Sequence, residues 1–415
     1  MSLAAACVRC KTETNAMLGS PTTMSQGAQR SWRGTGRAVG KIDRVTRLFF
    51  ASFVSWWFCS VATAADFSEV DVFTAGTEGY HTYRIPALVV TKSGTLLAIC
   101  EGRKTGRGDH GDVDLVQKRS LDGGKTWGPL ELIYEEGGAA KVTIGNPCPV
   151  IDQDTGVLWF PFTRENDAVF MMSSSDDGRT WSRPREITAD VKATNWNWYA
   201  TGPGNGVQLT RGKYKGRLVI PCDHRVNGDK NDKDNWDKAG RSHVILSDDH
   251  GQTWKLGGST DFGMNECAVV ELKNGTLLLN SRSYRGKACR GISLSRDGGA
   301  TWEPTTDDPA LVESVCQASL IRYSWLTEKK NSQGILLFSN PAVPKGRNHL
   351  TVRLSDDDGK IWLHSRLIFE GSSAYSSLAA LPSGQIGLLY ERDDYKQLTL
   401  ARFSPEWITT SAARQ

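Results

Sequence analysis

The sequence predicts an all-β chain folded as a six-bladed β-propeller, and three observations lead to this prediction. A short pattern recurs five times, strand signals bounded by turn dipeptides lie between the copies, and long amphipathic helical periods are nearly absent. The copies begin 48 to 73 residues apart. Repeats of this length indicate a radial or solenoid architecture, and a four-stranded propeller blade needs about 40 to 60 residues. The roughly 350 residues after an N-terminal leader accommodate six such blades. The alternative, a β-sandwich, does not explain regular repeats at this period.

The recurring pattern is Ser-x-Asp-x-Gly-x-Thr-Trp, and in its last copy Ile361 replaces the Thr. The copies begin at Ser120, Ser174, Ser247, Ser295 and Ser355. Ser and Asp side chains bond nearby backbone groups in tight turns, and Gly supplies the positive φ that such turns need. The Trp is large enough to wedge between adjacent sheets. We therefore interpret the five motifs as hairpin corners that stabilise the fold, and not as catalytic residues.

Apolar and β-branched runs predict individual strands between these corners. The expected ranges are 85–90, 95–100, 114–118, 157–162, 169–172, 217–221, 242–246, 275–280 and 334–338.

The first 65 residues differ from the rest of the chain. They hold eight basic and two acidic side chains, and an apolar run from Leu48 to Val61 is followed by small residues. This pattern is typical of a secretory signal sequence, and the 14-residue run is short for a membrane span, which needs about 20 residues. We expect cleavage near Ala64 or Ala65 and a single propeller domain over residues 66–415. The protein is then secreted or periplasmic; an uncleaved membrane anchor and a lysosome-like lumen are the alternatives.

Charge and cysteine usage exclude some function classes. The formal charge of +4 comes from the leader, since the remaining chain has 42 basic and 44 acidic side chains. Such a chain lacks the clustered basic face that a nucleic-acid partner needs. Six cysteines after the leader are scattered, so their pairing is not predicted. Asp152-x-Asp154 resembles the start of a calcium loop but has no distal Glu, and we expect no metal site.

A second motif, Tyr83-Arg84-Ile85-Pro86, stands near the start of the predicted domain. Together with the five repeats, it resembles the sialidase (neuraminidase) family over roughly residues 66–405. Members of that family are six-bladed propellers with the active site at the centre of one face. The resemblance implies an exo-α-sialidase, a glycoside hydrolase acting on sialylated oligosaccharides, glycoproteins or glycolipids. It implies no cofactor and no obligatory protein partner.

The resemblance also implies a substrate clamp. Arg84, Arg282 and Arg347 match the three arginines that bind the substrate carboxylate, with Arg353 as the alternative to Arg347. Arginine suits this role because it stays protonated and its fork matches the two oxygens of a carboxylate. Three arginines from separate repeats would converge only in a closed radial fold.

Three further residues match the family's catalytic groups. Asp109 matches the acid/base, with Asp112 and Asp114 as alternatives because the loop register is uncertain. Tyr375 matches the nucleophile and Glu266 the carboxylate that accepts its proton. A tyrosine avoids the repulsion that a carboxylate nucleophile would meet from an anionic sugar, and sialidases are known exceptions to the two-carboxylate scheme. Net retention of configuration follows from a tyrosyl–glycosyl intermediate. Glu101 and Arg103 are expected to support the pocket.

Other functions remain open at this point. A propeller that binds sialoglycans without cleaving them is one alternative, and a hydrolase for deaminated sialic acid is another. A trans-sialidase would use aromatic residues to hold an acceptor sugar, and Trp196, Trp198 and Tyr199 are the candidates for such a rim. The same residues would equally serve the N-acetyl or glycerol arm of the substrate.

Overall fold

The computed structural model describes residues 67–410 apart from 139, 227–234 and 326–333. The leader lies outside the described residues, so its signal sequence, its cleavage and the domain boundary at residue 66 stay predictions. Helices in the described part are short: α1 (Thr188–Val191), α2 (Trp236–Ala239) and α3 (Pro405–Thr409). None of them has the length or the apolar character to cross a membrane. The predicted all-β class is confirmed.

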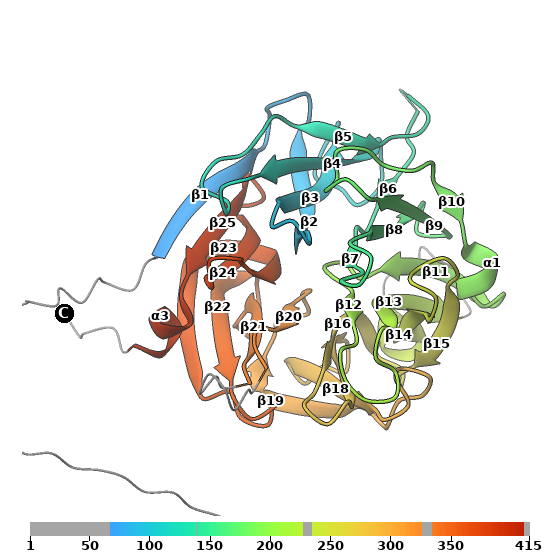
Figure 1. Cartoon of the computed structure of the whole chain (residues 1–415), viewed down its shortest axis with the longest axis vertical. Coiled ribbons are helices and arrows are strands. Elements are labelled where there is room, and N and C mark those ends of the chain that lie inside the picture. The colour runs from blue at the N-terminus through green and yellow to red at the C-terminus, as the bar shows by residue number, and fades with distance from the viewer. Residues whose placement is uncertain (1–66, 139, 227–234, 326–333, 411–415) are drawn as a thin grey trace, which may run out of the picture. The chain divides into compact units, whose positions relative to one another are not determined.

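The strands form antiparallel sheets arranged radially around a centre (Figure 1). The first sheet contains β2 (Thr82–Val90), β3 (Leu96–Arg103), β4 (Val113–Ser120) and β5 (Glu131–Tyr134). The second contains β6 (Ile144–Gly145), β7 (Val150–Ile151), β8 (Leu158–Arg164), β9 (Ala168–Ser174) and β10 (Arg185–Glu186). The third contains β11 (Trp196–Thr201), β12 (Val207–Gln208), β13 (Leu218–Val226), β14 (Gly240–Ser247) and β15 (Lys255–Ser259). The fourth contains β16 (Met264–Glu271), β17 (Leu277–Ser283), β18 (Cys289–Ser295) and β19 (Thr306–Val312).

The last sheet is larger and closes the ring. It contains β20 (Ser319–Arg322), β21 (Leu336–Pro341), β22 (Asn348–Ser355), β23 (His364–Ala380), β24 (Ile386–Arg392), β25 (Gln397–Phe403) and β1 (Phe67–Thr74). The first strand thus pairs with the last, from Phe67 opposite Phe403 to Thr74 opposite Gln397. This pairing joins the two ends of the described chain in one sheet.

The prediction of six separate four-stranded blades is wrong in its count of sheets. Among the described residues, four sheets have the four or five strands of a single blade, and the remaining sheet has seven. The cause is the 17-residue strand β23. Its first half pairs with β22 and its second half, from Ser373 on, pairs with β24. The fold shown is therefore a propeller-like arrangement with four blade-sized sheets and one joint sheet.

The repeated motifs form the expected hairpin corners. In the first copy, the Thr126 hydroxyl donates to Oδ2 of Asp122 at 2.7 Å, and the Gly124 N–H donates to the Ser120 hydroxyl at 2.8 Å. Three other copies repeat both bonds. The fifth copy keeps the bond from the Gly359 N–H to the Ser355 hydroxyl, at 2.8 Å, but lacks the bond from a Thr hydroxyl to the Asp carboxylate, because Ile361 has no hydroxyl.

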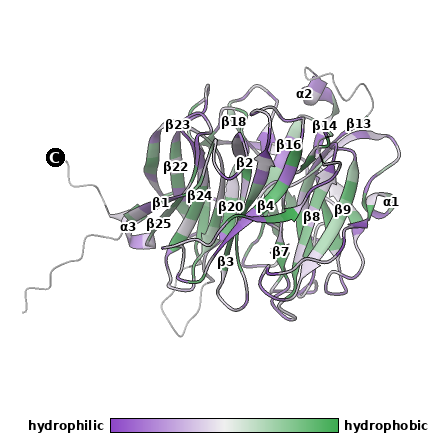
Figure 2. Ribbon diagram, turned by 90° about the horizontal axis from the view of Figure 1, so that it is seen from above, coloured by the Kyte–Doolittle hydropathy of each residue, from purple (hydrophilic) through white to green (hydrophobic). Residues whose placement is uncertain are grey.

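These corners also join neighbouring sheets, as predicted for the Trp residues. Trp127 packs against a buried cluster that contains Leu88 of β2 and Leu400 of β25. The Gly251 corner approaches the second sheet so closely that a Cβ there would lie 2.1 Å from the Trp159 ring, and its φ is +87°. Figure 2 shows hydrophobic residues, in green, along the strands of the sheets. The six described cysteines, whose pairing the sequence did not predict, are all buried and free.

Candidate active site

Three β-bulges interrupt the strands that carry predicted site residues. Pairing is interrupted between Arg84 and Ala87 in β2, between Met264 and Cys267 in β16, and between Ser373 and Ser376 in β23. Ile85 within the first bulge has φ +59°, which is rare for a β-branched residue. A bulge turns a side chain away from the regular alternation of a strand, and bulges are common next to active sites. Here they lie beside Arg84, Glu266 and Tyr375.

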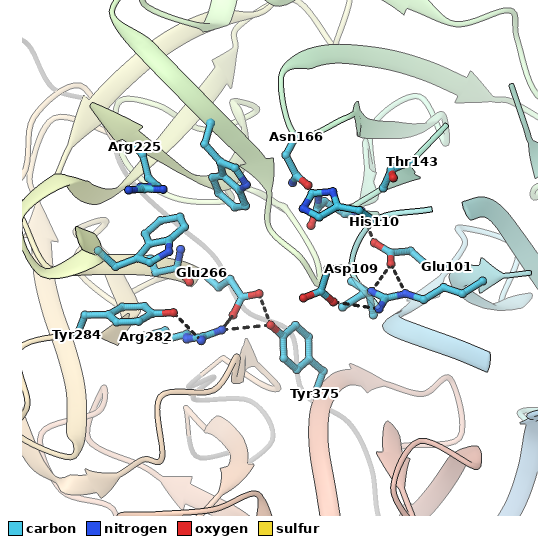
Figure 3. Close-up of a pocket in the computed structure, with 16 residues that line it drawn as sticks. Glu101, Asp109, His110, Thr143, Asn166, Arg225, Glu266, Arg282, Tyr284 and Tyr375 are labelled. Carbon is cyan, nitrogen blue, oxygen red and sulfur yellow. Dashed lines mark hydrogen bonds and ion pairs between the residues drawn. The ribbon is translucent and has the colours of Figure 1, made fainter. Parts of the chain in front are cut away.

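Tyr375 and Glu266 form the centre of the site (Figure 3). The Tyr375 hydroxyl donates a short hydrogen bond to Oε1 of Glu266. Nη1 of Arg282 lies 2.7 Å from Oε2 of Glu266 and 3.2 Å from the Tyr375 oxygen. Burial raises the pKa of Tyr375 well above its ordinary value, and Glu266 adds to the rise while Arg282 and Arg347 oppose it. The phenol is therefore protonated at rest, with a carboxylate in position to take its proton.

The three predicted arginines converge on Tyr375. The Cζ atoms of Arg84 and Arg347 lie 5.3 and 5.6 Å from the centre of its ring, and Arg282 contacts its hydroxyl. They come from β2, β17 and the segment before β22, so only the closed ring brings them together. The alternative residue Arg353 instead donates to Oδ1 of Asn340 at 3.0 Å. The geometry thus favours Arg347 over Arg353.

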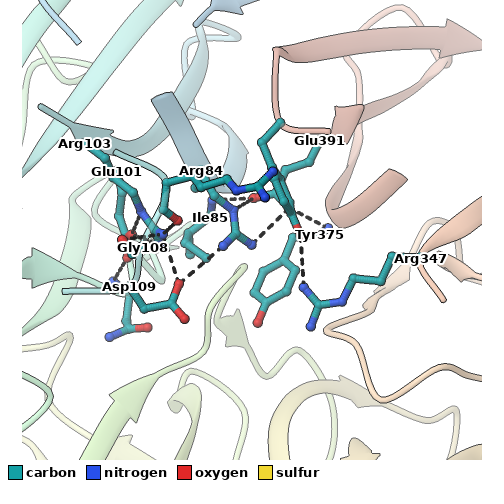
Figure 4. Close-up of polar contacts among 12 residues, drawn as sticks. Arg84, Ile85, Glu101, Arg103, Gly108, Asp109, Arg347, Tyr375 and Glu391 are labelled. Carbon is teal, nitrogen blue, oxygen red and sulfur yellow. Dashed lines mark hydrogen bonds and ion pairs between the residues drawn. The ribbon is translucent and has the colours of Figure 1, made fainter. Parts of the chain in front are cut away.

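A buried carboxylate, Glu391, connects two of these residues (Figure 4). It accepts from Nε of Arg84 at 3.0 Å and from the backbone N–H groups of Ile85 and Tyr375 at 2.9 and 3.0 Å. Sequence reasoning did not identify Glu391 as a site residue. The sequence did contain one indication of its role, because Glu391 follows the apolar residues of β24 (Ile386–Arg392). In the structure Glu391 is fully buried.

Asp109 lies on the loop between β3 and β4 and is held by two arginines (Figure 4). Its Oδ1 is 2.9 Å from Nη1 of Arg103 and 3.3 Å from Nη1 of Arg84. Nη1 of Arg103 also donates to the carbonyl groups of Arg107 and Gly108, and its Nη2 pairs with Glu101 at 2.6 Å. The Asp109 side chain is 72% exposed, and the desolvation that it does experience raises its pKa. Arg103 and Arg84 outweigh this effect and leave the pKa of Asp109 below its ordinary value.

The two alternatives to Asp109 face elsewhere. Asp112 and Asp114 both pair with Lys104, at 3.3 and 3.1 Å, and Asp114 also accepts from the Tyr80 hydroxyl. Neither lines the cavity that contains Asp109 and Tyr375. Lys104 and these two carboxylates instead fix the base of the Asp109 loop.

A cavity of about 260 Å³ lies over the Tyr375–Glu266 pair. Its walls include Asp109, Arg282 and several residues that sequence reasoning did not assign to the site. Among these are Asn166, Arg225, Trp236 and Tyr284. Of the expected aromatic rim, only Trp198 lines the cavity, with its ring 4.9 Å from that of Trp236. Tyr199 is fully buried, and Trp196 stacks on His224 with ring centres 3.4 Å apart, so neither forms part of a rim.

Within the described residues, the potential metal ligands that approach one another are Asp152, Asp154 and His250. Asp152 is fully buried and its carboxylate already accepts from Thr155, Gln208 and His250. It also accepts from the Asp154 N–H at 3.0 Å, so it organises a hairpin turn. This cluster lies outside the walls of the cavity.

Known proteins resemble this chain in sequence and in fold. Residues 94–388 match the BNR repeat-like domain family. A solved Hadza microbial sialidase shares 30% identity and a TM-score of 0.72, covering 82% of this chain and 69% of that one. The chain belongs to the sialidase family. The resemblance carried by the Tyr-Arg-Ile-Pro motif and the repeats is thereby confirmed.

Two curated bacterial sialidases are similar in sequence but longer. The chain is 35% identical to the sialidase of Micromonospora viridifaciens, over 82% of this chain and 54% of that protein. It is 35% identical to the sialidase of Bacteroides fragilis, over 78% of this chain and 62% of that protein. This sialidase-family chain thus spans between half and two thirds of the length of these relatives. An intramolecular trans-sialidase from Ruminococcus gnavus, at 19% identity and a TM-score of 0.70, shares the fold.

Proposed function

We propose that this chain hydrolyses terminal α-linked sialic acids from glycoconjugates, with retention of configuration. One observation carries the proposal: a buried phenol, Tyr375, donates to Glu266 while three arginines converge on it. A tyrosine nucleophile paired with a carboxylate suits a sugar that is itself anionic. Membership of the sialidase family supports the same substrate class.

Substrate binding begins with charge. Sialic acid carries a carboxylate on its anomeric carbon, and Arg84, Arg282 and Arg347 supply permanent positive charge around Tyr375. In the free site Arg84 pairs with Asp109. The incoming carboxylate competes for Arg84, so binding separates Asp109 from one of its two cations and brings a negative charge near it. Both changes raise the pKa of Asp109 and favour its protonated form.

In the first chemical step, the Tyr375 oxygen attacks the anomeric carbon as its proton passes to Glu266. The bond from the anomeric carbon to the leaving oxygen breaks, and Asp109 donates its proton to that oxygen. The arginines balance the carboxylate through the oxocarbenium-like transition state. The products of this step are a tyrosyl–glycosyl intermediate and the free aglycone.

In the second step, the ionised Asp109 accepts a proton from water as the water oxygen attacks the anomeric carbon. The bond to the Tyr375 oxygen breaks, and Glu266 returns the proton to the phenol. Two displacements at one carbon leave the product with the configuration of the substrate. Asp109 and Glu266 both end in their starting protonation states, so the cycle balances.

We further propose that the seven-stranded sheet acts as two blades that share β23, which makes the propeller six-bladed. The register supports this, because β20 to β22 pair with the first half of β23 while β24, β25 and β1 follow its second half. The bulge between Ser373 and Ser376 lies where the two halves meet and contains Tyr375. In this proposal the nucleophile, Tyr375, lies in the bulge at the start of the sixth blade.

The test is release of sialic acid from a fluorogenic α-sialoside by the purified protein. Tyr375→Phe and Asp109→Ala are the test variants, and Tyr323→Phe is the matched control because its hydroxyl bonds Gly384 away from the cavity. Proton NMR of the early product records its anomeric form. We expect the α-anomer to be the first product. Tyr375→Phe should lose turnover, whereas the control Tyr323→Phe should keep it. Binding without cleavage by the unmodified chain would favour a sialoglycan-binding propeller, and transfer to an added acceptor sugar would favour a trans-sialidase.

A further inference from the structure

Tyr395 lies in an unusual turn between β24 and β25. Asp393, Asp394 and Tyr395 have φ values of +53°, +55° and +66°, so three successive residues with side chains occupy the left-handed region. This region is disfavoured for such residues, and it persists only where the surroundings determine it. The Asp393 N–H donates to the Ser372 carbonyl at 2.9 Å, and the Ser372 hydroxyl donates to Oδ1 of Asp394 at 2.8 Å. These bonds tie the turn to the strand that leads into Tyr375.

The turn places Tyr395 against two of the three arginines. The Cζ atom of Arg84 lies 4.2 Å from the centre of the Tyr395 ring, within cation–π range. Nη1 of Arg347 donates to the Tyr395 hydroxyl at 3.3 Å. The ring also packs against the small buried cluster that contains Ile85 and Tyr375. One side chain therefore contacts both Arg84 and Arg347.

The two arginines differ in how they are otherwise held. Arg84 is fixed by Glu391 and Asp109. Within the part of the chain that the structure describes, Arg347 makes no ion pair, and its guanidinium hydrogen bond is the one to Tyr395. A carboxylate at this place would neutralise Arg347. A phenol is a neutral acceptor with an electron-rich face, so it holds both cations while leaving their charge available.

We propose that Tyr395 is a positioning residue that holds Arg84 and Arg347 together as one clamp for the carboxylate of an anionic substrate. The inference rests on the proposed function, in which these arginines bind sialic acid. Tyr395 does not line the cavity over Tyr375 but borders a neighbouring one with Arg347. Its loss should therefore weaken binding of the carboxylate more than it slows the chemical steps.

The experiment compares Tyr395→Leu, which removes the ring, with Tyr395→Phe, which keeps the ring and loses only the acceptor for Arg347. Tyr323→Phe is again the control. KM and kcat are measured with the α-sialoside, and inhibition constants are measured for 2,3-didehydro sialic acid and for its methyl ester. For Tyr395→Leu we expect KM and the inhibition constant of the free acid to rise about tenfold, with kcat changed less. Tyr395→Phe should lie between this variant and the unmodified chain.

The methyl ester decides between a clamp and a general structural role. It lacks the charge that the clamp recognises, so its inhibition constant should not change in either Tyr395 variant. Equal weakening of acid and ester, or no weakening of the acid in Tyr395→Leu, would overturn the proposal. If Tyr395→Leu does not fold, Tyr395→Phe must still show the selective loss for the acid. If the protein binds the acid in a way that depends on Tyr395 but cleaves no sialoside, only the proposed hydrolysis is refuted. If the folded protein does not bind the acid at all, both the proposed hydrolysis and the proposed role of Tyr395 are refuted.

Discussion

Asp109 and Arg84 form an ion pair in the free site, with Oδ1 of the carboxylate 3.3 Å from Nη1 of the guanidinium. The proposed acid/base and a proposed ligand of the substrate carboxylate thus hold each other until substrate arrives. Arg103 contributes the second cation, at 2.9 Å from the same oxygen. In the proposed mechanism, substrate binding and protonation of Asp109 are therefore coupled, and this coupling has a measurable consequence.

The first prediction concerns pH. Arg103 and Arg84 lower the pKa of Asp109 in the free site, so its acid form is lost as pH rises through that lowered pKa. The bound carboxylate occupies Arg84 and raises the pKa. Because kcat/KM reports the free enzyme and kcat the complex, the alkaline limb of kcat should lie at higher pH than that of kcat/KM. Initial rates from about pH 3 to pH 8 test this. Coinciding limbs would show that the Arg84 pair does not compete with substrate.

The second prediction concerns the buried pair of Glu391 and Arg84. Glu391 is fully buried and Arg84 nearly so, and removing one partner of such a pair leaves the other charge uncompensated. Glu391→Gln should lower the free energy of unfolding by about 3–5 kcal/mol. The double variant Arg84→Met with Glu391→Gln should lose less than the sum of the single variants. Urea unfolding of the four proteins gives the coupling energy, and additive losses would contradict a direct interaction.

The third prediction concerns Asp223, a fully buried carboxyl behind the site whose side chain accepts from Nδ2 of Asn265. Burial raises its pKa well above the ordinary value, and Glu266 adds to the rise while Arg282 opposes it. The folded chain then keeps a proton that the unfolded chain releases above about pH 3.9, so Asp223 lowers stability as pH rises above that value. Asn is neutral at every pH.

Asp223→Asn should therefore be more stable than the unmodified chain at neutral pH, and the difference should shrink as the pH falls toward 4. The midpoint of urea unfolding, measured at a series of pH values, checks this. A difference that does not vary with pH would show that Asp223 is ionised in the folded chain.

Local patterns in the sequence identified the residues that lie inside distinctive segments. Arg84, Glu266 and Tyr375 each belong to a short stretch whose residue types limit the choice, and the structure brings these residues together. Asp112 and Asp114 were alternatives to Asp109 because the alignment of this loop with the family's motif was uncertain. In the structure both alternatives pair with Lys104, whereas Asp109 lines the cavity.

Contacts between distant segments were not predictable in the same way. Glu391 and Arg84 are 307 residues apart and meet only because the last sheet closes against the first. Tyr395 reaches Arg84 through a left-handed turn that its own sequence, Asp-Asp-Tyr, does not demand. The joint sheet was missed for a related reason: β23 continues through Ser372 and Ser373 instead of turning there, so a repeat count overestimates the number of separate sheets.

The last prediction uses the one repeat that departs from the pattern. In the four complete motifs the Thr hydroxyl donates to the Asp carboxylate at 2.6 to 2.7 Å. In the fifth, Ile361 offers Asp357 only its backbone N–H, at 2.9 Å, and the residue is 61% exposed. Ile361→Thr adds the missing hydrogen bond and removes little buried apolar surface. Ile361 does not line the cavity over Tyr375, so activity should not change.

We expect Ile361→Thr to raise the free energy of unfolding by about 0.5–1 kcal/mol, the range for one net hydrogen bond near the surface. Thr126→Val in the first motif is the matched opposite change and should lower it by a similar amount. Urea unfolding of both variants beside the unmodified chain measures the two effects. If Thr126→Val is destabilised while Ile361→Thr gains nothing, the fifth turn does not present Asp357 as the other motifs present their Asp. The apolar side chain of Ile361 would then itself contribute to that corner.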